Sequence, residues 1–175
     1  MAVEHVYVLG LDRELDAEAR VERLVSEHQT KLARYVRRFV NDSGLALDIV
    51  QDVFFAAYRM LRSDPSRPLS AGWLYKTATN FSISYLRKQK RRGETLALED
   101  NHCAFRTDEQ SAQSLDLQKA LAALGEEQLS CVLLTTYAGY SSAEAALILG
   151  TSPDAVRQRV CRAMRAMRKN LAEPC

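Results

Sequence analysis

Apolar residues recur along most of the chain at steps of three and four, the period of an α-helix. The turn-forming residues 41–44 end the first such run and predict a break before a second helix over about 45–62. Two prolines make residues 64–68 a loop, and a third helix is expected from about 70 to 90. The first run comprises Val21, Leu24, Val25, His28, Leu32, Tyr35, Val36 and Phe39.

Two segments lack a clear helical pattern of apolar residues. Residues 3–9 alternate weakly, so the segment 1–20 fits a short strand, a helix or a disordered arm. Residues 93–114 are polar, acidic and without period, which is typical of a flexible linker. After them, a helical face restarts at 115 and a further helix is expected over 126–137.

Two short, sharply delimited helices close the pattern. Ser141 and Glu144 fit a capping box, and Gly150 suits the residue just after a helix because it adopts positive φ readily. Thr151 or Ser152 then caps a helix over 153–171 whose first residue is a proline. Helix, tight glycine turn and helix together predict a helix-turn-helix. The fold class is therefore all-α, with two small helical domains joined by a flexible acidic linker.

Charge is arranged in blocks that the formal net charge of +2 conceals. Residues 65–93 contain no acid and seven Lys or Arg, and residues 155–172 contain no acid and six. The segment between them is acidic. Solvated helix faces normally intersperse acids with bases, so two acid-free basic blocks favour contact with a polyanion such as nucleic acid.

The helix over 153–171 combines this charge with the helix-turn-helix. Its N-terminal residues are the ones that can reach base edges in a major groove. Arginine can bind guanine with two hydrogen bonds, and glutamine can do the same with adenine. Asp154 is expected to cap the helix rather than to contact a base. The candidate DNA-binding residues are Arg157, Gln158, Arg159, Arg162 and Arg165.

Composition excludes several classes. Of the 175 residues, 47% are hydrophobic and 26% charged, as in soluble folded proteins. No apolar run approaches the ~20 residues of a membrane helix, and no secretory signal is visible, so a cytoplasmic protein without membrane insertion is expected. No nucleophile motif, phosphate loop or paired-carboxylate pattern points to an enzyme, and no cofactor or metal is expected.

Several segments together resemble an extracytoplasmic-function (ECF) sigma factor of the sigma-70 family. Residues 47–54, 72–80 and 85–88 look like its region 2, and residues 124–128 and 139–163 look like its region 4. The resemblance covers about 21–171 in the family's order. It implies domains at 21–92 (region 2) and 115–171 (region 4), a linker at 93–114 and a tail at 172–175.

The resemblance implies that region 2 binds core RNA polymerase. Asp48, Gln51 and Asp52 form a stripe on the second helix, which in the family docks on the β′ coiled coil. Phe54 and Phe55 are adjacent and face different arcs, so at least one is expected near the surface, where it suits an interface anchor. These five residues are the candidate polymerase-binding site.

Region 2 is also expected to open the promoter and hold the −10 element. Aromatic side chains and a basic groove bind single-stranded bases. The candidates are Tyr75, Lys76, Asn80, Arg87 and Lys88, and the loop over 63–69 corresponds to the family's pocket for an unstacked base. Trp73 and Phe81 are expected in the core instead.

Region 4 is expected to read the −35 element as duplex through the arginine-rich helix. The implied partners are core polymerase (β′ and β subunits), promoter DNA and an anti-sigma factor. Two alternatives stay open. One is an autonomous helix-turn-helix regulator, and the other is a redox or metal sensor built on His102, Cys103, Cys131, Cys161 and Cys175.

Overall fold

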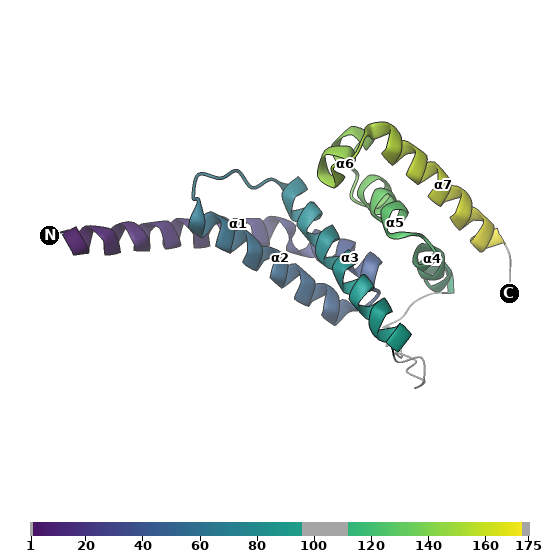
Figure 1. Cartoon of the computed structure of the whole chain (residues 1–175), viewed down its shortest axis with the longest axis horizontal. Helices are drawn as coiled ribbons and strands as arrows, with labels where there is room; N and C mark the ends of the chain where they lie inside the picture. The colour runs from purple at the N-terminus through teal and green to yellow at the C-terminus, as the bar shows by residue number, and fades with distance from the viewer. Residues whose placement is uncertain (1, 96–111, 173–175) are drawn as a thin grey trace.

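A computed structural model describes residues 2–95 and 112–172, with the side chains of 16–93 and 116–169. The described residues form seven α-helices and one π-helix, and contain no strand. Figure 1 shows α1, α2 and α3 as one bundle, with α4 to α7 forming a second bundle beside it. The all-α, two-domain prediction is confirmed.

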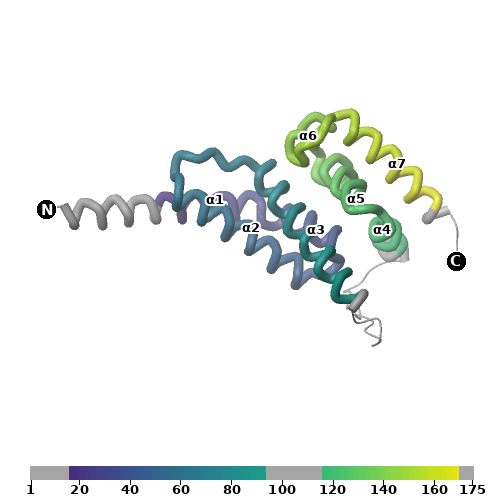
Figure 2. Tube along the Cα trace, in the orientation of Figure 1, coloured from purple at the N-terminus to yellow at the C-terminus, as the bar shows by residue number. Residues whose placement is uncertain are grey.

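The first bundle contains the three longest helices. They are α1 (Ala2–Val40), α2 (Ser43–Ser63) and α3 (Ala71–Thr95). The segment 2–20, for which the sequence leaves three structures open, forms the first half of α1. Figure 2 shows α1 running beside α2. The break after α1 is shorter than predicted. Asn41 adopts a positive φ of 52°, and Asp42 caps α2 by accepting a 3.0 Å hydrogen bond from the Leu45 amide.

The core of this bundle forms where the apolar faces of α1, α2 and α3 meet. Leu32, Val53 and Leu74 are fully buried, one from each helix. Tyr35 carries a hydroxyl into this core and meets the Thr79 hydroxyl at 2.7 Å. Because Thr79 donates its own proton to the Tyr75 carbonyl, the Tyr35 hydroxyl is the donor to Thr79. Burial raises the pKa of Tyr35, so the phenol stays neutral.

The second bundle comprises α4 (Ala112–Ala122), α5 (Glu126–Val132), η1 (Leu133–Tyr137), α6 (Ser142–Leu149) and α7 (Pro153–Ala172). The single helix predicted over 126–137 is therefore α-helical only to Val132 and continues as a π-turn. The Thr135 hydroxyl donates to the Cys131 carbonyl at 2.8 Å, and such a side-chain bond competes with regular helical hydrogen bonding.

The linker predicted at 93–114 lies largely outside the described residues. At its edges, α3 extends to Thr95 and α4 already begins at Ala112. No helix in the described part of the chain is long and apolar enough to span a membrane.

Candidate functional site

The exposed face of α2 carries most of the predicted polymerase-binding residues. Asp48, Gln51 and Asp52 are exposed, and Phe55 is 60% exposed, a large value for an aromatic side chain. Phe54 differs, because only 7% of it is exposed. Phe54 is therefore not an exposed anchor like Phe55, and what remains accessible of it faces the groove between α1 and α2. One helix position separates the two rings, and that 100° rotation turns Phe54 toward α1 and Phe55 outward.

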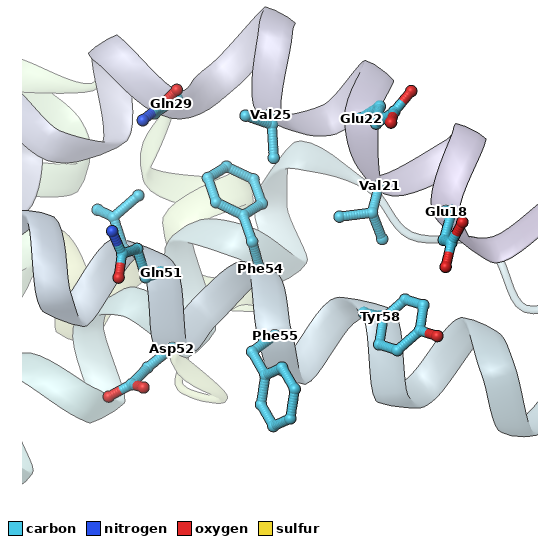
Figure 3. Close-up of a pocket in the computed structure, with 11 residues that line it drawn as sticks. Glu18, Val21, Glu22, Val25, Gln29, Gln51, Asp52, Phe54, Phe55 and Tyr58 are labelled. Atoms are coloured by element: carbon cyan, nitrogen blue, oxygen red, sulfur yellow. The ribbon is translucent and has the colours of Figure 1, made fainter. Parts of the chain in front are cut away.

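A groove between α1 and α2 borders this face (Figure 3). It has a volume of about 590 Å³, and its apolar lining includes Val21, Val25 and Phe54. Glu18 and Glu22 add acids from α1. In Figure 3 the Phe54 ring points toward α1, whereas the Phe55 ring points away from it. The arrangement suits an apolar partner helix flanked by basic residues.

A second groove of about 390 Å³ lies between α2 and α3. Asp52 and Phe55 line both grooves, so these two side chains stand on the ridge that separates them. Phe81 and Tyr85 of α3 line the far side. Both rings are half-buried and pack against the core, as does Trp73, so Trp73 and Phe81 border the core instead of lying within it as expected.

The predicted −10 residues on α3 divide into two groups. Lys76, Asn80, Arg87 and Lys88 are exposed. Tyr75 is only 8% exposed, and its ring makes edge-to-face contacts with Tyr35 at 4.8 Å and Tyr140 at 5.3 Å between centroids. Stacking on a base needs an accessible ring face, so Tyr75 cannot serve in this arrangement.

The loop between α2 and α3 is held by its own polar groups. The Asp64 carboxylate accepts hydrogen bonds from the Ser66 amide at 3.1 Å and the Ser66 hydroxyl at 2.6 Å. The Ser66 hydroxyl is the main cause of a lowered Asp64 pKa, and the charges of Arg67 and Arg20 lower it further. The Arg20 guanidinium also donates hydrogen bonds to two backbone carbonyls of the loop. No sequence signal points to this residue, because it lies in a segment whose structure the pattern leaves open.

The helix-turn-helix has the local structure that its sequence predicts. The Ser141 hydroxyl accepts from the Glu144 amide at 3.2 Å, and the Glu144 carboxylate accepts from the Ser141 amide at 2.8 Å. The Ser141 hydroxyl also donates to the Glu144 carboxylate at 2.6 Å, and this bond, followed by the bond from the Ser141 amide, lowers the pKa of that carboxyl. Gly150 ends α6 with a φ of 68°, and the Ser152 hydroxyl caps α7 by accepting from the Ala155 amide at 3.1 Å.

The arginines of α7 point in two directions. Arg157, Arg162 and Arg165 are exposed, as is Gln158. Arg159 is more sheltered, with a side chain 28% exposed that forms a 2.8 Å ion pair with Glu127 of α5. Asp154 does not cap the helix as expected, because Ser152 takes that place and Asp154 pairs with Arg157 instead.

The two bundles meet where α3 contacts α6 and where α1 contacts α4 and η1. A Cβ on Gly72 would lie 3.5 Å from Ile148, so the backbones approach closely here. Arg87 forms an ion pair with Glu126 across the two bundles, with a nitrogen–oxygen distance of 2.6 Å. Arg38 lies 5.3 Å from the centre of the Tyr137 ring. One predicted −10 residue is therefore already paired with an acid of the second bundle.

The cysteines form no metal site in the described part of the chain. Cys131 is buried, and burial raises the pKa of its thiol, whereas Cys161 is exposed. Among the described residues, no group of three His, Cys, Asp or Glu could hold an ion. His102, Cys103 and Cys175 lie outside the described residues.

Two family models match the chain in sequence order. Sigma-70 region 2 matches residues 24–92, which include most of the first bundle, and Sigma-70 region 4 matches residues 114–167, which include the helix-turn-helix.

Relatives match across both bundles. The chain is 31% identical over 164 residues to the ECF RNA polymerase sigma factor SigL of Mycobacterium tuberculosis, covering 90% of this chain and 92% of the relative. It is 32% identical over 155 residues to the RNA polymerase sigma factor CnrH of Cupriavidus metallidurans, covering 81% of each.

Solved structures agree. CnrH in complex with the cytosolic domain of CnrY superposes with a TM-score of 0.65 at 27% identity, covering 94% of this chain and 96% of that one. The sigma factor RpoE of Bartonella quintana, bound to the anti-sigma factor NepR, shares the fold with a TM-score of 0.69 at 22% identity, over 88% of this chain and 98% of that one. The chain therefore belongs to the sigma-70 family, as a sigma factor of the ECF group.

Proposed function

We propose that this sigma factor binds core RNA polymerase and directs it to promoters, with region 2 opening and reading the −10 element and region 4 reading the −35 element. It acts as an initiation factor without catalysis of its own, in the cytoplasm, where polymerase and DNA meet. The observation that carries the proposal is the match of both region models, in order, on two bundles that expose suitable surfaces.

Core binding is assigned to the exposed face of α2. Phe55 supplies an apolar anchor between two grooves, and Asp48, Gln51 and Asp52 surround it with polar groups. Buried aromatic anchors with polar rims are typical of protein interfaces. The partner is the coiled coil of the β′ subunit, and region 4 adds a contact with the β subunit.

Capture of the −10 strand is assigned to α3 and the α2–α3 loop. Asn80 offers an exposed amide to an unstacked base, and Lys76 and Lys88 offer charge to the backbone. Tyr75 has no role while it contacts Tyr140, and Arg87 must exchange Glu126 for phosphate.

Reading of the −35 duplex is assigned to the exposed residues at the start of α7. Arg157, Gln158 and Arg162 reach base edges, and Arg165, further along the helix, contacts phosphate. Arg159 has a supporting role, because its guanidinium already bonds Glu127 and the Thr151 hydroxyl.

An anti-sigma factor is the expected regulator. CnrH has been solved with CnrY and RpoE with the anti-sigma factor NepR, and both have this fold. In the arrangement of Figure 1, regions 2 and 4 lie against each other, so one inhibitor could contact both while they are held together.

The test is run-off transcription from fragmented genomic DNA of the source, using sigma-free bacterial core polymerase with and without the protein, with sequencing of RNA 5′ ends. Discrete starts that need the protein and share motifs near −35 and −10 support the proposal. An Asp52→Ala variant should weaken polymerase association while leaving duplex binding by region 4 unchanged. Tight duplex binding without any association with core polymerase would instead favour the autonomous regulator.

A further inference from the structure

The α2–α3 loop has a defined shape although its side chains are largely exposed. The Asp64 amide donates to the Met60 carbonyl at 2.9 Å, which ends α2, and the Asp64 side chain closes a turn on Ser66. Pro65 and Pro68 fix φ at two further positions. These contacts are all local, so they shape the turn without fixing where it lies on the bundle.

Arg20 makes the connection to the bundle. From α1, its guanidinium donates one hydrogen bond to the Pro65 carbonyl and another, at 3.0 Å, to the Arg67 carbonyl. The two acceptors are two residues apart, and the planar fork of a guanidinium suits such a pair. Beside this contact, Arg20, Arg23 and Leu24 line one side of a hollow of about 220 Å³ against Leu69.

A hydrogen bond that a backbone carbonyl of a loop accepts from outside the loop restricts the orientation of the peptide groups beside it. An ordered loop loses less conformational freedom on binding, which strengthens binding of whatever the loop holds. Removing a base from the duplex stack costs a few kcal/mol, so a loop that captures such a base gains most when it is already ordered before the base arrives.

We propose that Arg20 is a positioning residue for promoter opening, holding the α2–α3 loop in the shape that captures one unstacked −10 base. The inference rests on the proposed function and adds to it a residue that lies before the region 2 match, which begins at residue 24. Arg20 itself need not touch DNA, because its guanidinium is occupied by two carbonyls of the loop.

The experiment uses holoenzyme reconstituted from the full-length chain and core polymerase. Open-complex formation is compared between a promoter and derivatives with one −10 or −35 base pair changed. The variants are Arg20→Ala, Arg20→Lys and Arg23→Ala. Arg23→Ala is the matched control, since it removes the same charge from α1 beside the same hollow. Hydrogen exchange of the Ser66 and Arg67 amides reports the order of the loop, and thermal unfolding checks that each variant folds.

In Arg20→Ala we expect about tenfold weaker discrimination at one −10 position, unchanged discrimination at −35, and faster exchange of the loop amides. Arg20→Lys retains the charge but not the fork, so it should restore little of the lost discrimination. Arg23→Ala should behave as the wild type. If Arg20→Ala does not fold, the inference is tested by comparing the −10 discrimination of Arg20→Lys with that of Arg23→Ala.

Three results would overturn the inference. They are unchanged −10 discrimination in the Arg20 variants, an equal loss at every −10 and −35 position, and an equal effect of Arg23→Ala. The first leaves the proposed function standing if wild-type holoenzyme discriminates −10 bases. A wild-type holoenzyme with no −10 preference contradicts the proposed function itself, and the inference with it.

Discussion

Replacing Phe55 by alanine should separate polymerase binding from folding. The ring is 60% exposed, so its removal takes little from the core of the first bundle. Its neighbour Phe54 is 7% exposed and packs toward α1. The two adjacent phenylalanines therefore form a natural pair of variants in which the same chemical change is made on opposite sides of one helix.

The size of the effect follows from the exposed area. A phenylalanine side chain that buries about 200 Å² when fully covered, and is 60% exposed here, has about 120 Å² left for a partner. At about 25 cal/mol per Å² this area contributes up to about 3 kcal/mol of binding free energy. Since 1.4 kcal/mol corresponds to a factor of ten, Phe55→Ala should weaken core binding by up to about 150-fold.

The assay is titration of fluorescently labelled protein with core polymerase, together with urea unfolding of each variant alone. Phe55→Ala should unfold close to the wild type, and Phe55→Leu should retain most of the affinity because it keeps most of the apolar area. Phe54→Ala should lose about 3–5 kcal/mol of unfolding free energy. Wild-type affinity in Phe55→Ala, with the fold intact, would refute the assignment of α2 as the core-binding face.

Four other sites give testable predictions. Arg157→Ala and Arg162→Ala should each lower transcription from −35-dependent promoters by about 5- to 150-fold, at the 1–3 kcal/mol of a lost bidentate contact, while gel-shift binding to core polymerase is retained. Asn80→Ala should slow open-complex formation, followed by permanganate reactivity, more than it weakens closed-complex binding. Thr79→Val should lower the free energy of unfolding in urea by about 1–3 kcal/mol, because it leaves the buried Tyr35 hydroxyl without its acceptor. The pKa of Glu144 is lowered in the folded state, so the stability it contributes is present above its ordinary value of 4.5 and lost as the pH falls through the folded value. Acid titration by circular dichroism should show this loss, and Glu144→Gln should reduce it.

Local sequence signals predict the helix-turn-helix well. Its capping box, the left-handed glycine and the proline at the start of α7 each act within four residues, so their geometry can be read from spacing alone. The predicted role of Asp154 is wrong because two neighbouring oxygens compete for the same amides. Ser152 precedes the helix and caps it, which leaves Asp154 to pair with Arg157.

Contacts between distant segments are harder to predict. An aromatic residue in a basic helix suggests a DNA surface for Tyr75, yet Tyr35 of α1 and Tyr140, which lies between η1 and α6, enclose it. The contact of Arg20 with the loop cannot be predicted from the sequence either, because its acceptors are 45 and 47 residues away. Those acceptors are backbone carbonyls, which no side-chain pattern reveals. For Phe54 and Phe55, the helical period predicts that the two rings face different directions, but it does not predict which of them faces α1.

The polar and edge-to-face contacts between regions 2 and 4 are each weak, although buried side chains of both bundles also belong to one hydrophobic cluster. Arg87 and Glu126 remain 65% and 35% exposed, and exposed ion pairs contribute at most about 1 kcal/mol. The edge-to-face pair of Tyr75 and Tyr140 adds about 0.5–1.5 kcal/mol. Under the proposed function, a complex with polymerase of nanomolar affinity would supply about 12 kcal/mol, which exceeds what these two contacts contribute together. Binding that broke these contacts would release Arg87 from Glu126 without unfolding either bundle, and the proposed function assigns the released guanidinium to DNA.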